Sequence, residues 1–411
     1  MSAGRVLSQR GATPGGRGWR RRRARRIAIN ALLVVALLLV AVFGGAPLLT
    51  DRSGIARAIA WMESDIGDMH RFPSRTISRG GEVSPLPRGP EERALGLAVP
   101  NEALVGVSLD EFLADHATRA FLVVHRGRIV YERYFNGGGP TRLETSFSMA
   151  KSFTSTLVGI AVDEGAIRSI DDPITRYLPE LARRDSRFER IRVRDLLTMS
   201  SGLRYVEGGL PWSDDAVTYY GADLREVALE RPDIERPPNE QWHYDNFHPL
   251  LLGLILERAT KSRVADFMAS RLWRPMGAEA DASWSLDSKN SGFEKMESGV
   301  NARARDFARF GELFLHGGRY NGRRIVSAEW VRQATSGTAL DDPADFYGAM
   351  WWVDPQADAR RDPFFARGKY GQMIGVVPDQ DLVVVRLGSD DAGVDWQELI
   401  LDLAQRLPAH G

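Results

Sequence analysis

A serine and a lysine three residues apart, Ser148 and Lys151, are the residues of this chain best suited to catalysis. Apolar residues at helical spacing follow them (Phe153, Leu157 and Ile160), so the segment is predicted to be a helix. Residues i and i+3 are neighbours across one helical turn, which puts the lysine amine within reach of the serine hydroxyl. A serine becomes a nucleophile when an adjacent base takes its proton, and a lysine can be that base if burial or nearby positive charge lowers its pKa.

This pair is distinctive because lysine is rare in the chain. There are 49 arginines and only five lysines, and this is the only Ser-x-x-Lys. Arginine cannot lose its proton near neutral pH. A lysine at position 151, in a chain that otherwise uses arginine, therefore indicates a side chain that has to give up its proton. The N-terminus of the helix adds N–H groups that favour developing negative charge. The alternative interpretation is a core-facing helix with one solvated lysine.

Tyr244 and Asn246 are predicted to lie at the start of a second helix. A Pro-Pro-Asn turn at 237–239 precedes them, and the leucine-rich run 249–256 is too short to span a membrane, so it reads as a buried helix. A tyrosine near a lysine ammonium can shuttle protons, and Asn246 is placed to orient Lys151. The alternative is that the Tyr-x-Asn sequence only caps the helix.

Several other kinds of chemistry are disfavoured by the sequence. There is no Gly-x-Ser-x-Gly elbow, His-Glu-x-x-His zinc motif, Gly-x-Gly-x-x-Gly or phosphate loop, and no metal or organic cofactor is expected. His243 and His248 flank Tyr244, and structural hydrogen bonding is the favoured interpretation for both. The absence of cysteine excludes disulfides, a thiol nucleophile and a lipoprotein anchor.

The charge distribution divides the chain into a basic N-terminus and an acidic body. The first fifty residues hold nine arginines and no acid, and the remainder has 45 basic against 54 acidic residues, which argues against nucleic-acid binding. Residues 1–26 are predicted to be a basic cytoplasmic tail and 27–49 a single transmembrane anchor, with the catalytic body outside the cytoplasm. The alternative for this segment is a cleavable signal peptide. Residues 50–100 are predicted to be a spacer and 101–411 the catalytic domain.

The elements that must position these residues form an α+β pattern. Phe121–His125 and Arg128–Tyr134 are predicted to be a hairpin around Arg126-Gly127. Helical segments follow, and a final helix is expected over Asp395–Leu407. Between them the chain returns to strands, expected over Tyr347–Val353, Phe364–Ala366, Met373–Val377 and Leu382–Leu387. This order predicts one antiparallel sheet built from both chain ends, flanked by helices, with a helical subdomain inserted.

From about Leu104 to Leu407 the chain resembles the serine β-lactamase-like and penicillin-binding-like hydrolases. Within them it is most similar to the class C β-lactamase-related branch, which includes esterases and 6-aminohexanoate-dimer hydrolases. The resemblance rests on Ser148-Met-Ala-Lys151, on Tyr244-Asp-Asn246, and on Asp195-Leu-Leu-Thr-Met-Ser-Ser-Gly202 between them. It implies a β-lactamase/transpeptidase-like fold, acylation of Ser148, Lys151 as base, and Tyr244 as donor of a proton to the leaving group.

The third motif of this group, Lys-Thr-Gly or His-x-Gly, is replaced by Ala366-Arg367-Gly368. The continuation to Gln372 is in the style of the 6-aminohexanoate-dimer hydrolases. The resemblance implies that the backbone N–H groups of Ser148 and Lys369 form an oxyanion hole, with Gly368 and Gln372 supporting it. Tyr205 and Arg367 are candidates for the substrate wall.

The sequence therefore predicts a membrane-anchored serine hydrolase that cleaves a small-molecule ester or amide. Loss of the motif's lysine or histidine weakens the case for recognising the carboxylate of a β-lactam or a peptide. Two alternatives stay open: a β-lactamase or DD-peptidase acting on cell-wall peptides, and a sensor that is acylated without turnover. The sequence does not indicate an oligomeric state.

Overall fold

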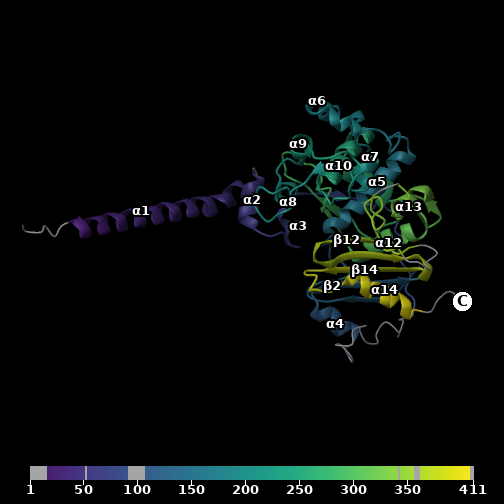
Figure 1. Ribbon diagram of the computed structural model, residues 1–411. Coiled ribbons are helices and arrows are strands. Elements are labelled where there is room, and N and C mark those ends of the chain that lie inside the picture. The colour runs from purple at the N-terminus through teal and green to yellow at the C-terminus, as the bar shows by residue number, and fades with distance from the viewer. Residues whose placement is uncertain (1–15, 51–52, 91–106, 341–342, 356–361, 408–411) are drawn as a thin grey trace, which may run out of the picture.

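A six-stranded antiparallel sheet forms the centre of one half of the molecule, as seen in a computed structural model that describes residues 16–50, 53–90, 107–340, 343–355 and 362–407 (Figure 1). Its order is β11-β12-β13-β14-β2-β3. β14 pairs with β2, so the sheet joins both ends of the domain, as predicted. The strands are β2 (Thr118–His125), β3 (Arg128–Tyr134), β11 (Trp352–Val353), β12 (Phe364–Gly368), β13 (Gln372–Val377) and β14 (Leu382–Gly388).

The sheet is buried on both faces because its strands are apolar at successive positions. In β2, Leu122 and Val124 face the larger core while Phe121 and Val123 face a smaller one, as the twofold alternation of a strand requires. α12 (Ala304–Leu315) packs on the first face. α4 (Leu109–Asp115) and α14 (Trp396–Arg406) cover the second (Figure 1).

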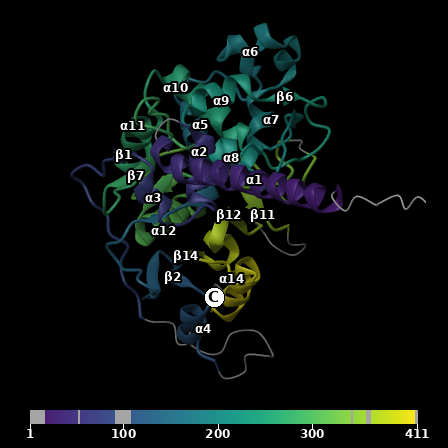
Figure 2. The same ribbon diagram turned by 90° about the vertical axis from the view of Figure 1, so that its left-hand side faces the viewer.

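The remaining helices form the predicted helical region above the sheet (Figures 1 and 2). At its centre is α5 (Ala150–Asp163), which packs against α10 (Phe247–Thr260). The face of α5 that carries Ser152 and Ser155 is buried as completely as its apolar face, and Ser152 donates to the carbonyl of Met350 at 2.7 Å. The other helices are α6 (Pro179–Arg184), α7 (Val193–Leu197), α8 (Asp214–Tyr220), α9 (Leu224–Glu230), α11 (Val264–Met268) and α13 (Ala328–Ala334).

Three smaller sheets complete the fold. A four-stranded sheet runs β1-β7-β8-β4, and two-stranded pairs are formed by β5 with β6 and by β9 with β10. The strands are β1 (Ser74–Ile77), β4 (Glu144–Thr145), β5 (Leu203–Arg204), β6 (Asp233–Ile234), β7 (Ala282–Ser285), β8 (Val300–Ala302), β9 (Arg319–Tyr320) and β10 (Arg323–Arg324).

Part of the stretch expected to be a spacer is packed against the body. α2 (Gly54–Trp61) lies against α8, α3 (Asp68–Arg71) follows it, and β1 adds an edge strand to β7. The buried guanidinium of Arg57 donates hydrogen bonds to the carbonyls of Thr50, Tyr220 and Asp287. The folded body therefore begins well before residue 100. Residues 91–106, which include the end of the expected spacer and the start of the expected catalytic domain, lie outside the described residues.

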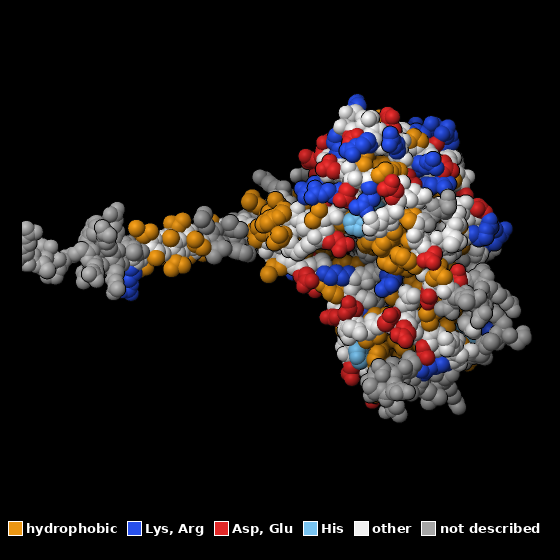
Figure 3. Space-filling model, viewed as in Figure 1, with side chains coloured by type: hydrophobic (Ala, Val, Ile, Leu, Met, Phe, Trp, Pro, Cys, Tyr) orange, Lys and Arg blue, Asp and Glu red, His pale blue; other side chains and the backbone are white. Residues whose placement is uncertain are grey.

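α1 (Gly16–Gly45) projects from the body, and several of its apolar side chains are exposed (Figures 1 and 3). Among the helices of the described residues, none combines the length and the apolar character that crossing a membrane requires. The transmembrane anchor predicted over 27–49 is therefore not supported.

Candidate active site

Ser148 and Lys151 meet at the start of the central helix. Ser148 lies in a short 3₁₀ turn, Phe147–Met149, that leads directly into α5. The Nζ of Lys151 lies 3.0 Å from the Oγ of Ser148, and it also donates to the backbone carbonyl of Glu297 at 3.1 Å. The lysine is 2% exposed, whereas Ser148 is partly open to solvent. This is the arrangement that a nucleophile and its base require.

The residue before Ser148 has an unusual backbone conformation. Phe147 has a φ of +42°, in the left-handed region that non-glycine residues seldom occupy. Its ring packs edge-on against Tyr370 at 5.5 Å, which helps to hold the turn in place. Backbone strain of this kind persists only where the surrounding structure imposes it, and it concentrates at functional sites.

Tyr244 contacts Lys151 through its ring. The Nζ of the lysine lies 4.8 Å from the ring centroid, a cation–π distance. On its other side Tyr244 stacks on Trp352 of β11 at 5.9 Å. The structure thus brings together the three residues proposed to act chemically, although nearly a hundred positions separate Tyr244 from Ser148.

Asn246 and Tyr205 are hydrogen bonded to each other below the site. The side-chain amide of Asn246 donates to the hydroxyl of Tyr205 at 2.9 Å, in place of the expected contact with Lys151. Tyr205 in turn donates to Asp215 at 2.7 Å, and burial raises the pKa of Tyr205 well above its usual value. Asn246 and Asp215 line the pocket, whereas Tyr205 is buried under them. Tyr205 therefore supports the pocket from below and is not part of its wall as predicted.

A buried polar cluster anchors the first turn of α10. His248 Nε2 lies 2.6 Å from Ser201 Oγ and 3.4 Å from Asp245 Oδ2. Burial lowers the pKa of His248 to about 3 and raises that of Asp245 well above its usual value. Burial thus disfavours the charged form of each group, and the cluster fixes the segment that presents Tyr244.

The end of β12 approaches the turn that carries Ser148 so closely that a side chain would not fit. A Cβ added at Gly368 would lie 2.3 Å from the carbonyl oxygen of Ser146. This contact brings Lys369, the next residue, to the same pocket edge as Ser148, and both line the cavity. The oxyanion hole expected from the amides of Ser148 and Lys369 stays a prediction, with both residues on the same pocket.

Two buried side chains hold the turn after Lys369. Gln372 donates to the carbonyls of Lys369 at 3.2 Å and Gly388 at 2.6 Å, and Arg386 donates to the carbonyl of Tyr370 at 2.6 Å. This support matters because Tyr370 has a φ of +62°. Arg386 is fully buried and stacks on Trp396, and burial lowers its pKa to about 9. Sequence reasoning placed Gln372 here but missed Arg386.

Arg367 is directed away from the pocket. Its guanidinium lies 4.9 Å from the Trp352 ring and 3.5 Å from Gln397, and it is not among the residues that line the cavity. The alternation of side chains along β12 accounts for this direction, because its neighbours Ala366 and Gly368 take the inward positions. Arg367 therefore does not form the substrate wall that was predicted for it.

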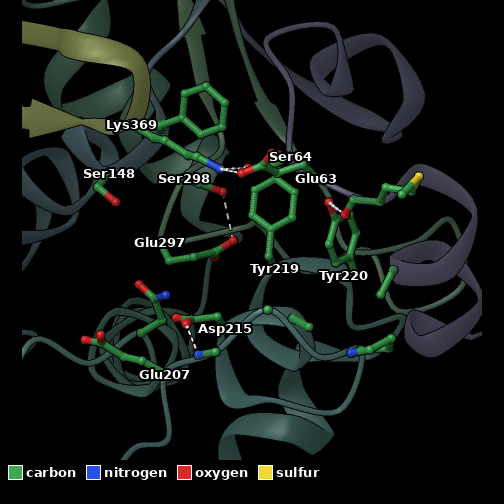
Figure 4. Close-up of a pocket in the computed structure, with 18 of the residues that line it drawn as sticks. Glu63, Ser64, Ser148, Glu207, Asp215, Tyr219, Tyr220, Glu297, Ser298 and Lys369 are labelled. Carbon is green, nitrogen blue, oxygen red and sulfur yellow. Dashed lines mark hydrogen bonds and ion pairs between the residues drawn. The ribbon is translucent and has the colours of Figure 1, made fainter. Parts of the chain in front are cut away.

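The pocket beside Ser148 has a volume of about 940 Å³ (Figure 4). Glu297 and Ser298 line it. Further lining residues lie between 58 and 64, in the part of the chain from α2 to β1 (residues 53–77), which we call the N-terminal segment. Glu297 accepts from Ser298 at 2.8 Å and from the buried Lys295 at 2.7 Å; burial lowers the pKa of Lys295. None of these residues was identified from the sequence, because no local pattern links them to Ser148.

Comparisons with known proteins agree with this architecture. A family model described as Beta-lactamase matches residues 109–405. The chain is 28% identical to the 6-aminohexanoate-dimer hydrolase of Paenarthrobacter ureafaciens, over 85% of this chain and 91% of that protein. Among solved structures, it resembles a Bacillus anthracis protein provisionally assigned as a 6-aminohexanoate-dimer hydrolase (TM-score 0.72, 24% identity, 84% of this chain and 94% of the other). It also resembles a D-stereospecific amidohydrolase from Streptomyces (TM-score 0.51, 18% identity, 68% and 92%).

Proposed function

The chain belongs to the β-lactamase family, and on that basis we propose that it is a serine hydrolase that cleaves an ester or an amide through an acyl-enzyme on Ser148. The observation that carries the proposal is the 3.0 Å contact between Lys151 Nζ and Ser148 Oγ. It occurs at the edge of a pocket large enough for a small-molecule substrate.

In the proposed reaction Lys151 takes the hydroxyl proton as Ser148 Oγ attacks the substrate carbonyl. The N–H groups of Ser148 and Lys369 stabilise the oxyanion, which is worth roughly 3–4 kcal/mol per donor. The proton then passes by way of Tyr244 to the departing alcohol or amine. A water molecule, deprotonated by the same residues, attacks the acyl-enzyme and releases the acid, which restores Ser148.

Esters and linear amides are favoured over β-lactams for a specific reason. The lysine or histidine of the third motif, linked by the resemblance to carboxylate recognition, is missing, and the guanidinium of Arg367 lies over Trp352. The lysine that does line the pocket, Lys369, contacts Ser64 and Glu63. The relative from Paenarthrobacter ureafaciens is named a 6-aminohexanoate-dimer hydrolase. We propose the same reaction class here, with the substrate itself unassigned.

A panel of p-nitrophenyl esters, linear amides and a β-lactam tests the proposal. We expect steady turnover of esters or amides by the parent protein and none by Ser148→Ala. A burst equal to the enzyme concentration without further turnover would favour the sensor, and preferential β-lactam hydrolysis would favour the β-lactamase. Unchanged ester turnover by Ser148→Ala would contradict the proposal.

A further inference from the structure

The charged side chains that line the pocket are mostly acidic. Glu63, Glu207, Asp215 and Glu297 line it, and Lys369 is the one lysine or arginine among the described lining residues (Figure 4). A carboxylate group on a substrate would therefore have Lys369 as its main electrostatic attraction in this cavity. The surroundings of Lys369 decide whether that attraction is available.

The ammonium of Lys369 is already occupied by the N-terminal segment. It donates to Ser64 Oγ at 2.9 Å and lies 3.4 Å from a carboxylate oxygen of Glu63 (Figure 4). Both residues belong to the loop between α2 and α3, more than 300 positions earlier in the chain. We call Met62–Asp65 the mouth loop, because it borders the open side of the pocket.

The mouth loop is attached to the body by tyrosine hydroxyls. Tyr370, beside Lys369, donates to the carbonyl of Ser64 at 2.5 Å, and Tyr220 of α8 donates to the carbonyl of Met62 at 2.9 Å. These contacts keep Ser64 and Glu63 within reach of Lys369. The fold thus holds Ser64 beside Lys369, and Glu63, which is 84% exposed, adds a surface ion pair.

Deeper in the pocket, Asp215 has no cationic partner among the described residues, whereas Glu297 is paired with the buried Lys295. The two oxygens of Asp215 accept from the Tyr205 hydroxyl at 2.7 Å and from the Gly208 N–H at 2.8 Å, both neutral donors. In Glu297, one oxygen lies 2.7 Å from the Lys295 ammonium, and the other is buried without a hydrogen-bond partner among the described residues. The carboxylate of Asp215 would therefore repel an anionic end of a substrate at short range.

We infer that the mouth loop determines the charge selectivity of the site: by engaging Lys369 it biases the enzyme against substrates whose acyl group carries a carboxylate. This inference rests on the proposed function and specifies its substrate class, namely neutral or positively charged acyl groups. Ser64 and Glu63 act as specificity-determining residues, and neither takes part in the proposed bond-breaking steps.

Three p-nitrophenyl esters with acyl chains of equal length, ending in a methyl, a carboxylate or a trimethylammonium group, test the inference. We expect the parent protein to show a kcat/KM for the carboxylate ester at least about 10-fold below that for the methyl ester. Glu63→Gln combined with Ser64→Ala frees Lys369 and should raise the carboxylate-to-methyl ratio by about 3- to 10-fold. The gain should shrink as NaCl rises from about 50 mM to about 500 mM, because salt screens exposed charges.

Glu82→Gln is the matched control. Glu82 is 81% exposed and Glu63 is 84% exposed, and Glu82 also pairs with a cation, Arg323, but outside the pocket. The control should leave the ratio unchanged. If deacylation is slow, the same ratio is measured from the rates at which methyl-ended and carboxylate-ended alkyl fluorophosphonates label the protein.

Two results would overturn the inference: equal rates for the carboxylate and methyl substrates in the parent protein, or an unchanged ratio in the mouth-loop double variant. Either result would leave the proposed function intact, provided that the methyl ester is turned over steadily and that this turnover requires Ser148. If Ser148→Ala turned over the methyl ester as fast as the parent protein, the proposed function itself would be contradicted.

Discussion

The amine of Lys151 is surrounded by neutral groups. It contacts a hydroxyl, a backbone carbonyl and an aromatic ring. Among the described residues no carboxylate pairs with it, although acids are as numerous as bases in the chain. A carboxylate partner would hold the lysine in its charged form, so this environment is consistent with the role of a base.

Lys151→Arg separates this role from that of a fixed positive charge. Arginine keeps its proton near neutral pH, so we expect ester turnover to fall by about 10²- to 10⁴-fold. Lys151→Met, uncharged and closer in volume, is the companion variant and should fail equally. Thermal melts should show both variants folded. An arginine variant with near-parent turnover would contradict the assignment of Lys151 as the base.

At the residue scale, the sequence predicted what is local. Ser148 and Lys151 are three positions apart on one helix, so their contact follows from helical geometry alone. Ser64, Glu297 and Arg386 reach the site from distant parts of the chain, and no spacing marks them. The sequence could not predict that Arg367 and Tyr205 are not part of the pocket wall, because the direction of each side chain depends on the neighbours it meets in the folded protein.

At the element scale, the contact between β12 and the turn before α5 holds Lys369 near Ser148, the two residues whose amides are proposed to form the oxyanion hole. Gly368→Ala would force a Cβ against the carbonyl of Ser146 and displace Lys369. We expect kcat to fall by about 10²-fold, the effect of losing an oxyanion donor, with the variant still folded by circular dichroism. Gly81→Ala, where a Cβ meets nothing within 4 Å, is the control. An unchanged kcat in Gly368→Ala would show that the close approach of Gly368 to Ser146 is not needed for catalysis.

The N-terminus of α7 provides a pH-dependent stability test. Asp195 accepts from the Arg192 N–H at 2.7 Å, and burial raises its pKa from 3.8 to about 6. Because the folded state binds the proton more tightly, the associated stability is full below about pH 4 and is lost as the pH rises through about 6. Asp195→Asn cannot titrate, so the parent should lose about 2–3 kcal/mol relative to the variant between about pH 4 and pH 7.

Urea melts of both proteins across this pH range measure that difference. A constant difference in the free energy of unfolding would show that Asp195 has an ordinary pKa.

The sheet and the main helices could be predicted because their patterns are strong. Alternation and β-branched runs predicted β2, β3, β13 and β14 close to their observed bounds. The strand expected over 347–353 is reduced to β11, because the chain turns at Met350, where φ is +59°. The polar face of α5 is buried by tertiary packing, which the helical period alone does not reveal.

At the scale of the whole molecule, the N-terminal segment is part of the catalytic body. Its short elements are mixed in composition, which is why the sequence suggested a spacer. In the structure the segment contributes β1 to a sheet and the mouth loop to the pocket. Stability and substrate selection are therefore both expected to depend on it.

Arg57→Met tests the attachment of this segment. Arg57 is 2% exposed and donates to carbonyls of the body, which would lose their partner. We expect the free energy of unfolding to fall by about 2–4 kcal/mol. Arg71→Met, which removes an arginine that is 47% exposed from the same segment, should cost less than about 1 kcal/mol. Equal effects of the two variants in chemical denaturation would show that the segment is not held through Arg57.

The most direct test of the central claim is the site of covalent labelling by a fluorophosphonate probe. Intact-protein mass spectrometry followed by peptide mapping should show one adduct per chain, located on Ser148, with none formed by Ser148→Ala and much slower formation by Lys151→Arg. An adduct on another residue, or one that persists in Ser148→Ala, would contradict the account.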